Sequence, residues 1–320
     1  MWSIKKNISS LSLSLLIVAS FLAQASAEKI GILTFSEEAR YLEAIKGFKD
    51  NLQKAGIKEP RVKFTLENAG ASKARAVELA QKLAAEKPDL IFTLGTSATV
   101  IAAREIKDVP IVFSTVYDPV EAGIAKDWRS SGNNTTGTSP LVPMSKLLDS
   151  LTAFASVKRL AVLYTPGEKN SEAQFKNLQK IQADYNIKII PVILSTKEEV
   201  VQVLPEILRT IDALYVTGSN VVDSQVATIV DLATKSKVAT ITHLEDLVEK
   251  GVLLGVCADS YLVGHLAGEK AIRILKGAKP AAIPIETIKK FDVMLNVKTA
   301  KQGRFYITPE FTKMITRTVE

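Results

Sequence analysis

The sequence predicts an α/β protein of two doubly wound, parallel-sheet lobes that are joined by a multi-crossover hinge. Short apolar runs alternate with amphipathic helical segments from residue 28 onward, and this series starts again after residue 140. Runs such as LIFTL and PIVF are almost continuously apolar, as parallel strands covered on both faces are. The length of 320 residues and a hydrophobic content of 47% suit two domains of ordinary size. One long sheet is the alternative interpretation.

The first half of the chain predicts a regular strand and helix alternation. Ala44, Ile45, Phe48 and Leu52 lie on one helical face, and Gly56 ends that helix. We expect strands at 29–35, 61–69, 89–95 and 109–116, and helices at 37–55, 72–86 and 97–106.

The second half repeats this pattern after a polar, glycine-rich segment at 130–140, which we interpret as a connector. Local similarity supports the repeat, because residues 90–100 align with 213–223 and residues 111–123 with 239–251. We expect helices at 143–154, 168–185, 196–209 and 222–236, and strands at 159–165, 187–194, 213–219 and 238–243.

The last 70 residues predict completion of both lobes rather than a third domain. A strand at 252–258 precedes a long helix at 261–276, and residues 285–297 have an extended pattern after Pro280 and Pro284. The predicted lobes are therefore 28–138 with 257–283, and 139–256 with 284–320. A chain that crosses several times between lobes forms a hinge.

The amino terminus has the features of a secretory signal peptide, residues 1–27. Lys5 and Lys6 precede a 13-residue, mostly apolar run, and Ala25-Ser26-Ala27 is a small-x-small cleavage signature. A membrane anchor is the alternative, but a spanning helix needs about 20 apolar residues. Cleavage after Ala27 leaves no cysteine for lipid attachment, so we expect a soluble periplasmic protein.

Charge and cysteine content exclude several classes of function. The formal net charge of +7 falls to +5 without Lys5 and Lys6, and no basic stripe interleaved with aromatic residues is present, so we expect no nucleic-acid partner. The only cysteine, Cys257, cannot form an internal disulfide. A buried strand thiol is favoured over a reactive nucleophile, because no acid-base partner lies near it in the sequence.

Candidate ligand-binding residues lie where strands end, because open α/β sheets bind ligands beyond the carboxyl ends of their strands. Gly95, Thr96 and Ser97 combine a tight turn, unpaired helix N–H groups and hydroxyl donors, which suits a carboxylate; ordinary helix capping is the alternative. The candidates in the first half are Ser36, Glu37, Thr96, Ser97, Thr115 and Tyr117.

The second half offers a matching set of strand-end residues. Asp259 is a candidate partner for an ammonium group, although helix capping explains it almost as well, as it does Asp118. His243 ends a strand, whereas His265 lies within a helix, and together they lack metal-ligand spacing. The candidates in this half are Tyr164, Glu168, Asn170, Ser219, Asn220, His243 and Asp259.

Several catalytic and cofactor motifs are missing from the sequence. It contains no G-x-x-x-x-G-K-[ST] phosphate loop, no G-x-G-x-x-G after the first strand, no G-x-S-x-G elbow and no H-E-x-x-H. Nucleotide hydrolysis, dinucleotide redox chemistry and standard serine or zinc hydrolysis lose support. From the absence of these motifs we expect no cofactor, no metal and no catalytic residue of these classes.

Six segments follow one another along the chain: KPDLIFTLGTSAT, VPIVFSTVYDPVEAGI, GNNTTGTS, RLAVLYTPGEKNS, ALYVTGSNVV and GVCADSYLVGHLAGEKAIRILKG. In this order and spacing they resemble the ABC-type transporter substrate-binding proteins of the tryptophan/tyrosine-binding-like family. The resemblance covers nearly all of the chain after residue 27. It implies a type I periplasmic-binding-protein fold with three crossovers, which closes on one small molecule and delivers it to a membrane permease with a cytoplasmic ATPase.

The resemblance also implies roles for individual residues. Family ligands include aromatic amino acids, so an aromatic or other amino acid is the leading expectation. Ser97 and Thr115 would then hold the carboxylate and Asp259 the ammonium group. Tyr164, Glu168 and Asn220 would contribute from the opposite lobe.

The sequence departs from the family pattern at two positions. Thr165 replaces the usual Asn, and Tyr117 replaces a more common small residue, so the pocket's shape and ligand can differ from those of the family.

Two other functions share the predicted fold. A periplasmic sensing protein would present its closed state to a receptor, and a secreted α/β enzyme would use Glu37, Glu168 or His243 in the same cleft. For a transport protein of this kind we expect a monomer.

Overall fold

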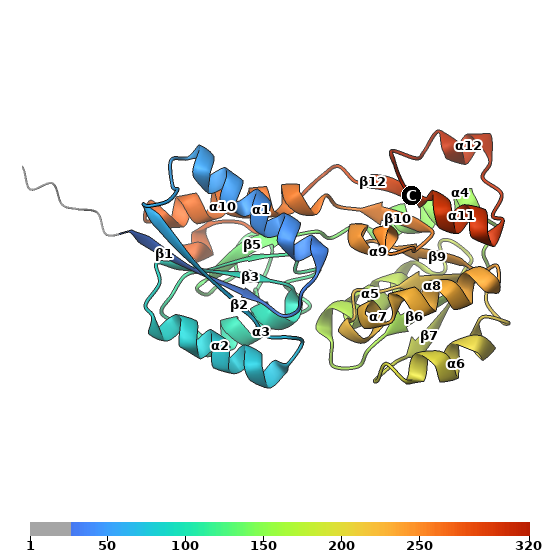
Figure 1. Cartoon of the computed structure of the whole chain (residues 1–320), viewed down its shortest axis with the longest axis horizontal. Coiled ribbons are helices and arrows are strands. Elements are labelled where there is room, and N and C mark those ends of the chain that lie inside the picture. Colours follow the sequence, from blue (N-terminus) through green and yellow to red (C-terminus); the bar gives the residue numbers. More distant parts are fainter. Residues whose placement is uncertain (1–26) are drawn as a thin grey trace, which may run out of the picture.

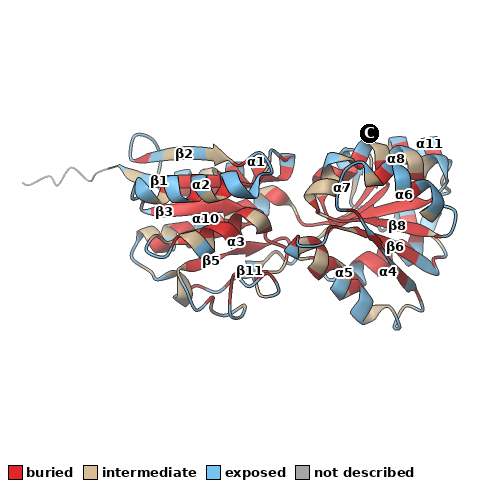
Figure 2. Cartoon of the chain, turned by 90° about the horizontal axis from the view of Figure 1, so that it is seen from below, coloured by how far each residue is buried: buried red, intermediate tan, exposed pale blue. Residues whose placement is uncertain are grey.

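The computed structural model describes residues 27–320, so the predicted signal peptide lies outside the described residues apart from Ala27. It confirms the predicted fold class, because the strands form two separate, largely parallel sheets with helices on both faces. The two lobes lie side by side, with the amino-terminal lobe at the left of Figure 1. Figure 2 shows that central strands of both sheets are buried, whereas the edge strand β2 is mostly intermediate or exposed and the outer faces of the helices are exposed.

The amino-terminal lobe is built on a six-stranded sheet in the order β11-β5-β4-β3-β1-β2. All of its strand pairs are parallel, as expected for strands linked by crossover helices. Its elements are β1 (Glu28–Thr34), α1 (Ala39–Lys54), β2 (Val62–Asn68), α2 (Lys73–Ala85), β3 (Leu90–Leu94), α3 (Thr96–Glu105), β4 (Ile111–Ser114), β5 (Thr135–Ser139), α10 (Ser260–Leu275), the short 3₁₀ helix η1 (Pro280–Ala282) and β11 (Glu286–Thr287).

The carboxy-terminal lobe contains a seven-stranded sheet in the order β13-β12-β10-β9-β8-β6-β7. Only the pairing of β10 with β12 is antiparallel. Its elements are α4 (Met144–Phe154), β6 (Arg159–Tyr164), α5 (Lys169–Ile181), β7 (Lys188–Ile193), α6 (Glu199–Ile207), β8 (Ala213–Val216), α7 (Asn220–Ser224), α8 (Val226–Lys235), β9 (Ala239–Thr242), α9 (Glu245–Glu249), β10 (Leu254–Cys257), β12 (Asp292–Asn296), α11 (Val297–Gly303), α12 (Pro309–Thr312) and β13 (Arg317–Val319).

The polar segment at 130–140 is not only a connector, because it contains the fully buried strand β5. Two of its three threonine hydroxyls have internal acceptors, because Thr136 donates to the Ile283 carbonyl at 2.8 Å and Thr138 to the Val263 carbonyl at 3.0 Å. The third, of Thr135, is buried and has no partner among residues 27–320. Satisfied hydroxyls and the preference of threonine for strands allow a polar run to lie inside a sheet. The expectation of a simple connector is therefore wrong for residues 135–139.

The chain passes between the lobes three times, after β5, after β10 and after β11. The segment predicted as one extended run, 285–297, divides between both sheets, because β11 pairs with β5 and β12 with β10. The last passage therefore follows Thr287, later than the predicted boundary at 284. Cys257 pairs with Asp292 in the carboxy-terminal sheet, so the second passage starts after it, whereas 257 was expected to begin the return to the first lobe.

The helix predicted at 222–236 divides into α7 and α8 at Gln225, whose backbone leaves the helical range at φ −120° and ψ 12°. Ser219 caps α7 by accepting a hydrogen bond from the Val222 N–H at 3.3 Å. The break leaves Asp223, near the end of the short helix, directed at the other lobe, where it meets Arg40.

Helix α10 is fixed to the amino-terminal lobe by close packing against α1 (Figure 1). A Cβ at Gly264 would overlap the carbonyl of Ala44, and one at Gly47 would overlap the carbonyl of Tyr261. The two helix backbones therefore touch where these glycines lie. This contact places the helix that follows the second crossover.

We predict that Gly264→Ala destabilises the protein by about 1–3 kcal/mol, because the added methyl group must push α10 away from α1. Urea unfolding of the chain from Glu28 onward measures the effect. Leu262→Ala on the same helix is the control, since Leu262 is 46% exposed and its loss should change the unfolding free energy by less than about 0.5 kcal/mol. Equal stabilities of the two variants would contradict the close-packing account.

Candidate ligand-binding site

A small cavity lies between the lobes, where the carboxyl ends of the two sets of strands face each other. Its volume is about 30 Å³. The amino-terminal lobe contributes Arg40, Tyr41, Thr96, Thr115 and Tyr117, the first crossover contributes Pro140, and the carboxy-terminal lobe contributes Asn170, Gln174, Gly218, His243 and Leu244. Because both lobes line it, the cavity exists only when they are together.

The amino terminus of α3 forms the polar part of the first wall. Gly95 takes the N-cap position at φ 85° and offers no side chain to the helix, so the first N–H groups of α3 have no side-chain cap. A Cβ at this position would overlap the Tyr41 hydroxyl. Thr115, itself at φ 56°, accepts from the Gly95 N–H at 2.9 Å and donates to the Ser114 carbonyl at 2.7 Å. These bonds fix the turn beside the uncapped helix end.

Asn170 and Gln174, one turn apart on α5, form the polar part of the opposite wall. The Asn170 amide donates to the Gly218 carbonyl at 2.5 Å, and Gln174 Oε1 accepts from the Gly218 N–H at 3.2 Å. The remaining oxygen of Asn170, Oδ1, is buried and has no hydrogen-bond partner among the described residues. A buried acceptor without a donor costs free energy unless a ligand supplies that donor.

His243 is buried at the base of the cavity and is held neutral. Its Nδ1 lies 2.7 Å from the Tyr215 hydroxyl, and its Nε2 lies 3.4 Å from the Gln174 amide nitrogen. Burial and the charge of Arg40 lower the pKa of His243 from 6.5 to about 3. Because Gln174 Oε1 is bound to Gly218, its NH₂ group faces Nε2, which places the imidazole proton on Nδ1.

Tyr117 extends from the amino-terminal lobe into the other lobe. Its side chain is 3% exposed and belongs to the apolar cluster that includes Leu147 and Tyr215. Its ring meets His243 edge-on, with 5.2 Å between the ring centroids.

Arg40, in the first turn of α1, joins the lobes through buried ion pairs. Its Nη1 lies 2.9 Å from an Asp223 oxygen and 2.7 Å from an Asp246 oxygen, both in the carboxy-terminal lobe, and its Nη2 pairs with Glu38 of its own lobe. Lys250 adds a second cation 2.6 Å from Asp223. We call these five residues the inter-lobe charge cluster.

Burial and charge act in opposite directions on the carboxylates of this cluster. Burial raises the pKa of Glu38, although Arg40 and the Ser36 hydroxyl favour its charged form. Burial also opposes ionisation of Asp223, but Arg40 and Lys250 outweigh it and leave the pKa of Asp223 lowered. The Oδ1 atom of Asp246 is buried and has no hydrogen-bond partner among residues 27–320. Such a cluster is stable only while Arg40 remains in place.

Thr96, Thr115, Tyr117, Asn170 and His243, all predicted from sequence, line the cavity. The other predicted residues lie elsewhere and have partners of their own. Ser36 donates to Glu38; Ser97 follows Thr96 at the start of α3; Tyr164 stacks on Phe175; Glu168 accepts from the backbone and side chain of Asn220; and Ser219 bonds Thr165. Glu37 is exposed.

Asp259 caps α10 by accepting from the Leu262 N–H at 2.9 Å and is not among the residues that line the cavity. Asp118 likewise accepts from the backbone N–H groups of Val120 and Glu121, in a turn rather than in a helix. In both cases the capping alternative describes what the side chain does in the structure.

The sequence argument missed Arg40, Tyr41 and Gln174. It considered only the residues directly after each strand, whereas these three lie within the first or second turn of the following helix. A signal was present at Arg40, because a cation beside Glu37 and Glu38 at the first strand end suggests an ion-pair cluster.

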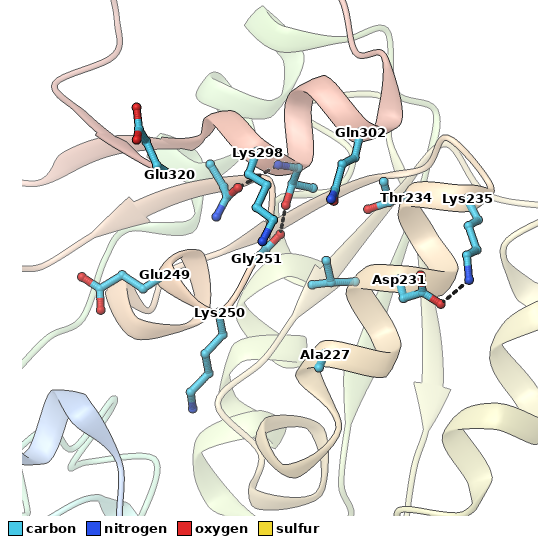
Figure 3. A pocket seen from close by; sticks show the side chains of 13 residues that line it. Ala227, Asp231, Thr234, Lys235, Glu249, Lys250, Gly251, Lys298, Gln302 and Glu320 are labelled. Carbon is cyan, nitrogen blue, oxygen red and sulfur yellow. Dashed lines mark hydrogen bonds and ion pairs between the residues drawn. The ribbon is translucent and has the colours of Figure 1, made fainter.

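A larger hollow of about 480 Å³ lies on the surface of the carboxy-terminal lobe between α8, α9 and α11 (Figure 3). Lysine and acidic side chains lie around it, among them Lys298, Asp231 and Glu249, and Thr299 donates to the Gly251 carbonyl at 2.7 Å within it. All of its lining residues belong to one lobe, so closure of the lobes cannot enclose a ligand there. The inter-lobe cavity is the better candidate.

Over residues 27–320, no group of three or more His, Cys, Asp or Glu residues is arranged to hold a metal ion. None of the helices in this part of the chain is long and apolar enough to cross a membrane.

We predict that Arg40→Ala opens the lobes, because it leaves three buried carboxylates with too few cations and opening returns them to water. Small-angle X-ray scattering should show a larger radius of gyration for the variant. Arg104→Ala removes an exposed pair with Glu105 and should leave the scattering unchanged. Identical curves for Arg40→Ala and the unaltered protein would contradict this role.

A second prediction concerns pH. Because the pKa of His243 is about 3 in the fold and 6.5 in the free side chain, the unfolded chain binds an extra proton between these values. Its contribution to stability is intact above pH 6.5 and is lost progressively below it, by about 2 kcal/mol at pH 5.

Urea unfolding at pH 7.5 and pH 5.0 measures this loss. His243→Gln should lose about 2 kcal/mol less than the unaltered chain between the two pH values. Equal losses in both proteins would show that His243 is not held neutral.

Comparison with known proteins identifies the family. Residues 29–318 match the family model described as ABC transporter substrate binding protein. The tyrosine-binding protein of Clostridioides difficile (strain R20291) is 31% identical over 276 residues, which are 86% of this chain and 80% of that protein.

Two solved structures give the same fold in different states. A Streptococcus pneumonia ABC domain in complex with L-Trp is 26% identical with a TM-score of 0.87, and a ligand-free, open substrate-binding protein with adhesive properties from Clostridium difficile is 30% identical with a TM-score of 0.73. Each comparison covers 92% of this chain and 100% of the other. The TM-score is higher against the L-Trp complex than against the ligand-free, open structure, although the identity is lower. On the family match and these similarities together, the chain belongs to the ABC transporter substrate-binding proteins.

Proposed function

We propose that this protein captures an α-amino acid between its lobes and delivers it to an ABC importer. One observation carries this proposal above the others. In the closed arrangement the uncapped amino terminus of α3 lies on one side of the cavity, and Asn170 Oδ1, which has no partner among residues 27–320, lies on the other. One wall thus offers donors to an anion, and the facing wall offers an acceptor to a cation, as an amino-acid zwitterion requires.

The ligand's carboxylate would bind at the start of α3. The first N–H groups of a helix lack internal partners and carry the positive end of the helix dipole, which favours an anion there. Thr96 and Thr115 line the cavity there, although the Thr115 hydroxyl already donates to the Ser114 carbonyl, and Ser97 follows Thr96 in the chain. Arg40 is a less suitable partner in the closed state because Glu38, Asp223 and Asp246 already surround it.

The ligand's ammonium group would bind at Asn170 Oδ1 rather than at Asp259. Asn170 is held in place by its bond to Gly218, so its free oxygen is directed without further ordering. Asp259 already accepts the N–H of Leu262 as a helix cap. The relatives' names, which specify tyrosine and L-Trp, support an amino acid as the class of ligand.

Capture would proceed by closure of the lobes about the three crossovers. A ligand bound on one lobe draws in the other lobe, and the inter-lobe charge cluster then forms over it. Family membership supports delivery to a membrane permease with its cytoplasmic ATPase, and the predicted signal peptide supports a periplasmic location. We propose that the protein acts as a monomer. We also propose that it performs no catalytic step, since His243, the histidine at the cavity, is neutral and bonded to Tyr215.

We predict that Asn170→Ala weakens amino-acid binding by about 10- to 100-fold, because a hydrogen bond to a charged group contributes about 1.5–3 kcal/mol. Isothermal titration calorimetry on protein that has been unfolded and refolded to remove bound ligand measures the affinity. The twenty amino acids form the test panel.

Asp259→Asn is the matched control, since asparagine also caps helices and should leave the affinity within about twofold. If Asp259→Asn lowered the affinity and Asn170→Ala did not, the ammonium group would bind at Asp259 and not at Asn170. No binding of any amino acid to the unaltered protein would reject the proposed ligand class, and turnover of a bound ligand would reject pure binding.

A further inference from the structure

Tyr117 occupies space between the lobes that a ligand's side chain would otherwise use. It lines the cavity with its ring among apolar residues of the carboxy-terminal lobe and its edge toward His243. The ring therefore lies between the proposed zwitterion-binding groups and the interior of the second lobe.

The Tyr117 side chain is fixed rather than free to swing away. Its backbone carbonyl accepts from the Ser139 hydroxyl at 2.6 Å, it lies two residues after Thr115, whose φ is positive, and its ring packs in the apolar cluster of the other lobe. Rotation of the ring out of the cavity would remove it from this cluster and expose an apolar ring that is now 3% accessible.

The space that remains is small. The cavity of about 30 Å³ corresponds to roughly two water molecules, because one water needs about 10–15 Å³ measured in this way. Pockets that enclose drug-sized ligands are about 300–1,000 Å³. The rim gives little extra room, since Tyr41 packs against Gly95 so closely that no Cβ fits there.

We infer that Tyr117 is a plug that sets the size of the ligand, so that the site selects amino acids with a compact side chain over aromatic ones. This inference rests on the proposed function and narrows its ligand class. An aromatic side chain would collide with the Tyr117 ring and hold the lobes apart, which would separate Arg40 from Asp223 and Asp246. The relatives whose names specify tyrosine and L-Trp would then differ from this chain in the room left for the side chain.

Tyr117→Ala tests the plug, with Tyr164→Ala as the matched control. Tyr164 is another strand-end tyrosine, but it stacks on Phe175 at 4.9 Å within its own lobe and does not line the cavity. Calorimetric titrations on refolded protein would compare glycine, L-alanine and L-serine with L-tyrosine and L-tryptophan. Circular dichroism and thermal unfolding would establish that each variant is folded.

The unaltered protein should bind at least one compact amino acid more tightly, by about tenfold or more, than it binds L-tyrosine or L-tryptophan, and Tyr164→Ala should do the same. A misfit of one or a few atoms in a pocket produces discrimination of this size. Tyr117→Ala should gain at least about tenfold in affinity for L-tyrosine or L-tryptophan. Tighter binding of an aromatic amino acid by the unaltered protein would overturn the inference, as would no gain in Tyr117→Ala.

A measurement that uses no amino acid distinguishes an error in the inference about Tyr117 from an error in the proposed function. p-Cresol has the shape of the side chain that Tyr117→Ala removes, so it should raise the melting temperature of that variant and leave the unaltered protein unchanged. If no protein binds any amino acid but p-cresol stabilises Tyr117→Ala, the plug stands and the amino-acid ligand class is rejected. If p-cresol does not stabilise the variant, the plug is rejected.

Discussion

The buried pairing of Arg40 with Asp223 and Asp246 is the contact on which the rest of the site depends. It connects the first helix of one lobe to two short helices of the other, and only with the lobes in this arrangement do the start of α3 and Asn170 face one cavity. Buried charges are costly unless each has a partner, so the cluster favours a single closed geometry and penalises partial closure. Electrostatic pairing across the cleft thereby defines the shape of the site as well as holding it shut.

Both polar and apolar contacts between the lobes stabilise the closed arrangement. On the charged side the inter-lobe charge cluster fixes the rim, and Lys176 of α5 pairs with Glu121 at 2.7 Å on the exposed surface, where such a pair contributes little. On the apolar side Tyr117 leaves its own lobe to pack with the core of the other. A ligand therefore has to fit between groups that already bind one another. Its own contribution to closure is to supply partners for the uncapped N–H groups of α3 and for Asn170 Oδ1.

Much of the fold was predictable because it depends on local patterns. Apolar runs such as that of β3, helix stops such as Gly56 and the repeated order of elements identify two parallel-sheet lobes. The buried polar strand β5 was not predictable, because the hydroxyls of Thr136 and Thr138 find their acceptors far along the chain. The site shows the same division. Strand ends indicated Thr96 and Asn170. The sequence near Arg40 shows Glu37 and Glu38 but not its partners Asp223 and Asp246, which are distant in sequence and belong to the other lobe.

The most direct test of closure on a solute measures the distance between the lobes during ligand titration. Spin labels at Arg75→Cys on α2 and Val201→Cys on α6 lie at exposed positions on different lobes, while the native Cys257 is buried and its raised pKa keeps it unreactive. Pulsed electron resonance on refolded protein should show a longer distance without ligand and a shift to a shorter one as an amino acid is added. A distance distribution that stays the same when binding is saturated would contradict capture by lobe closure.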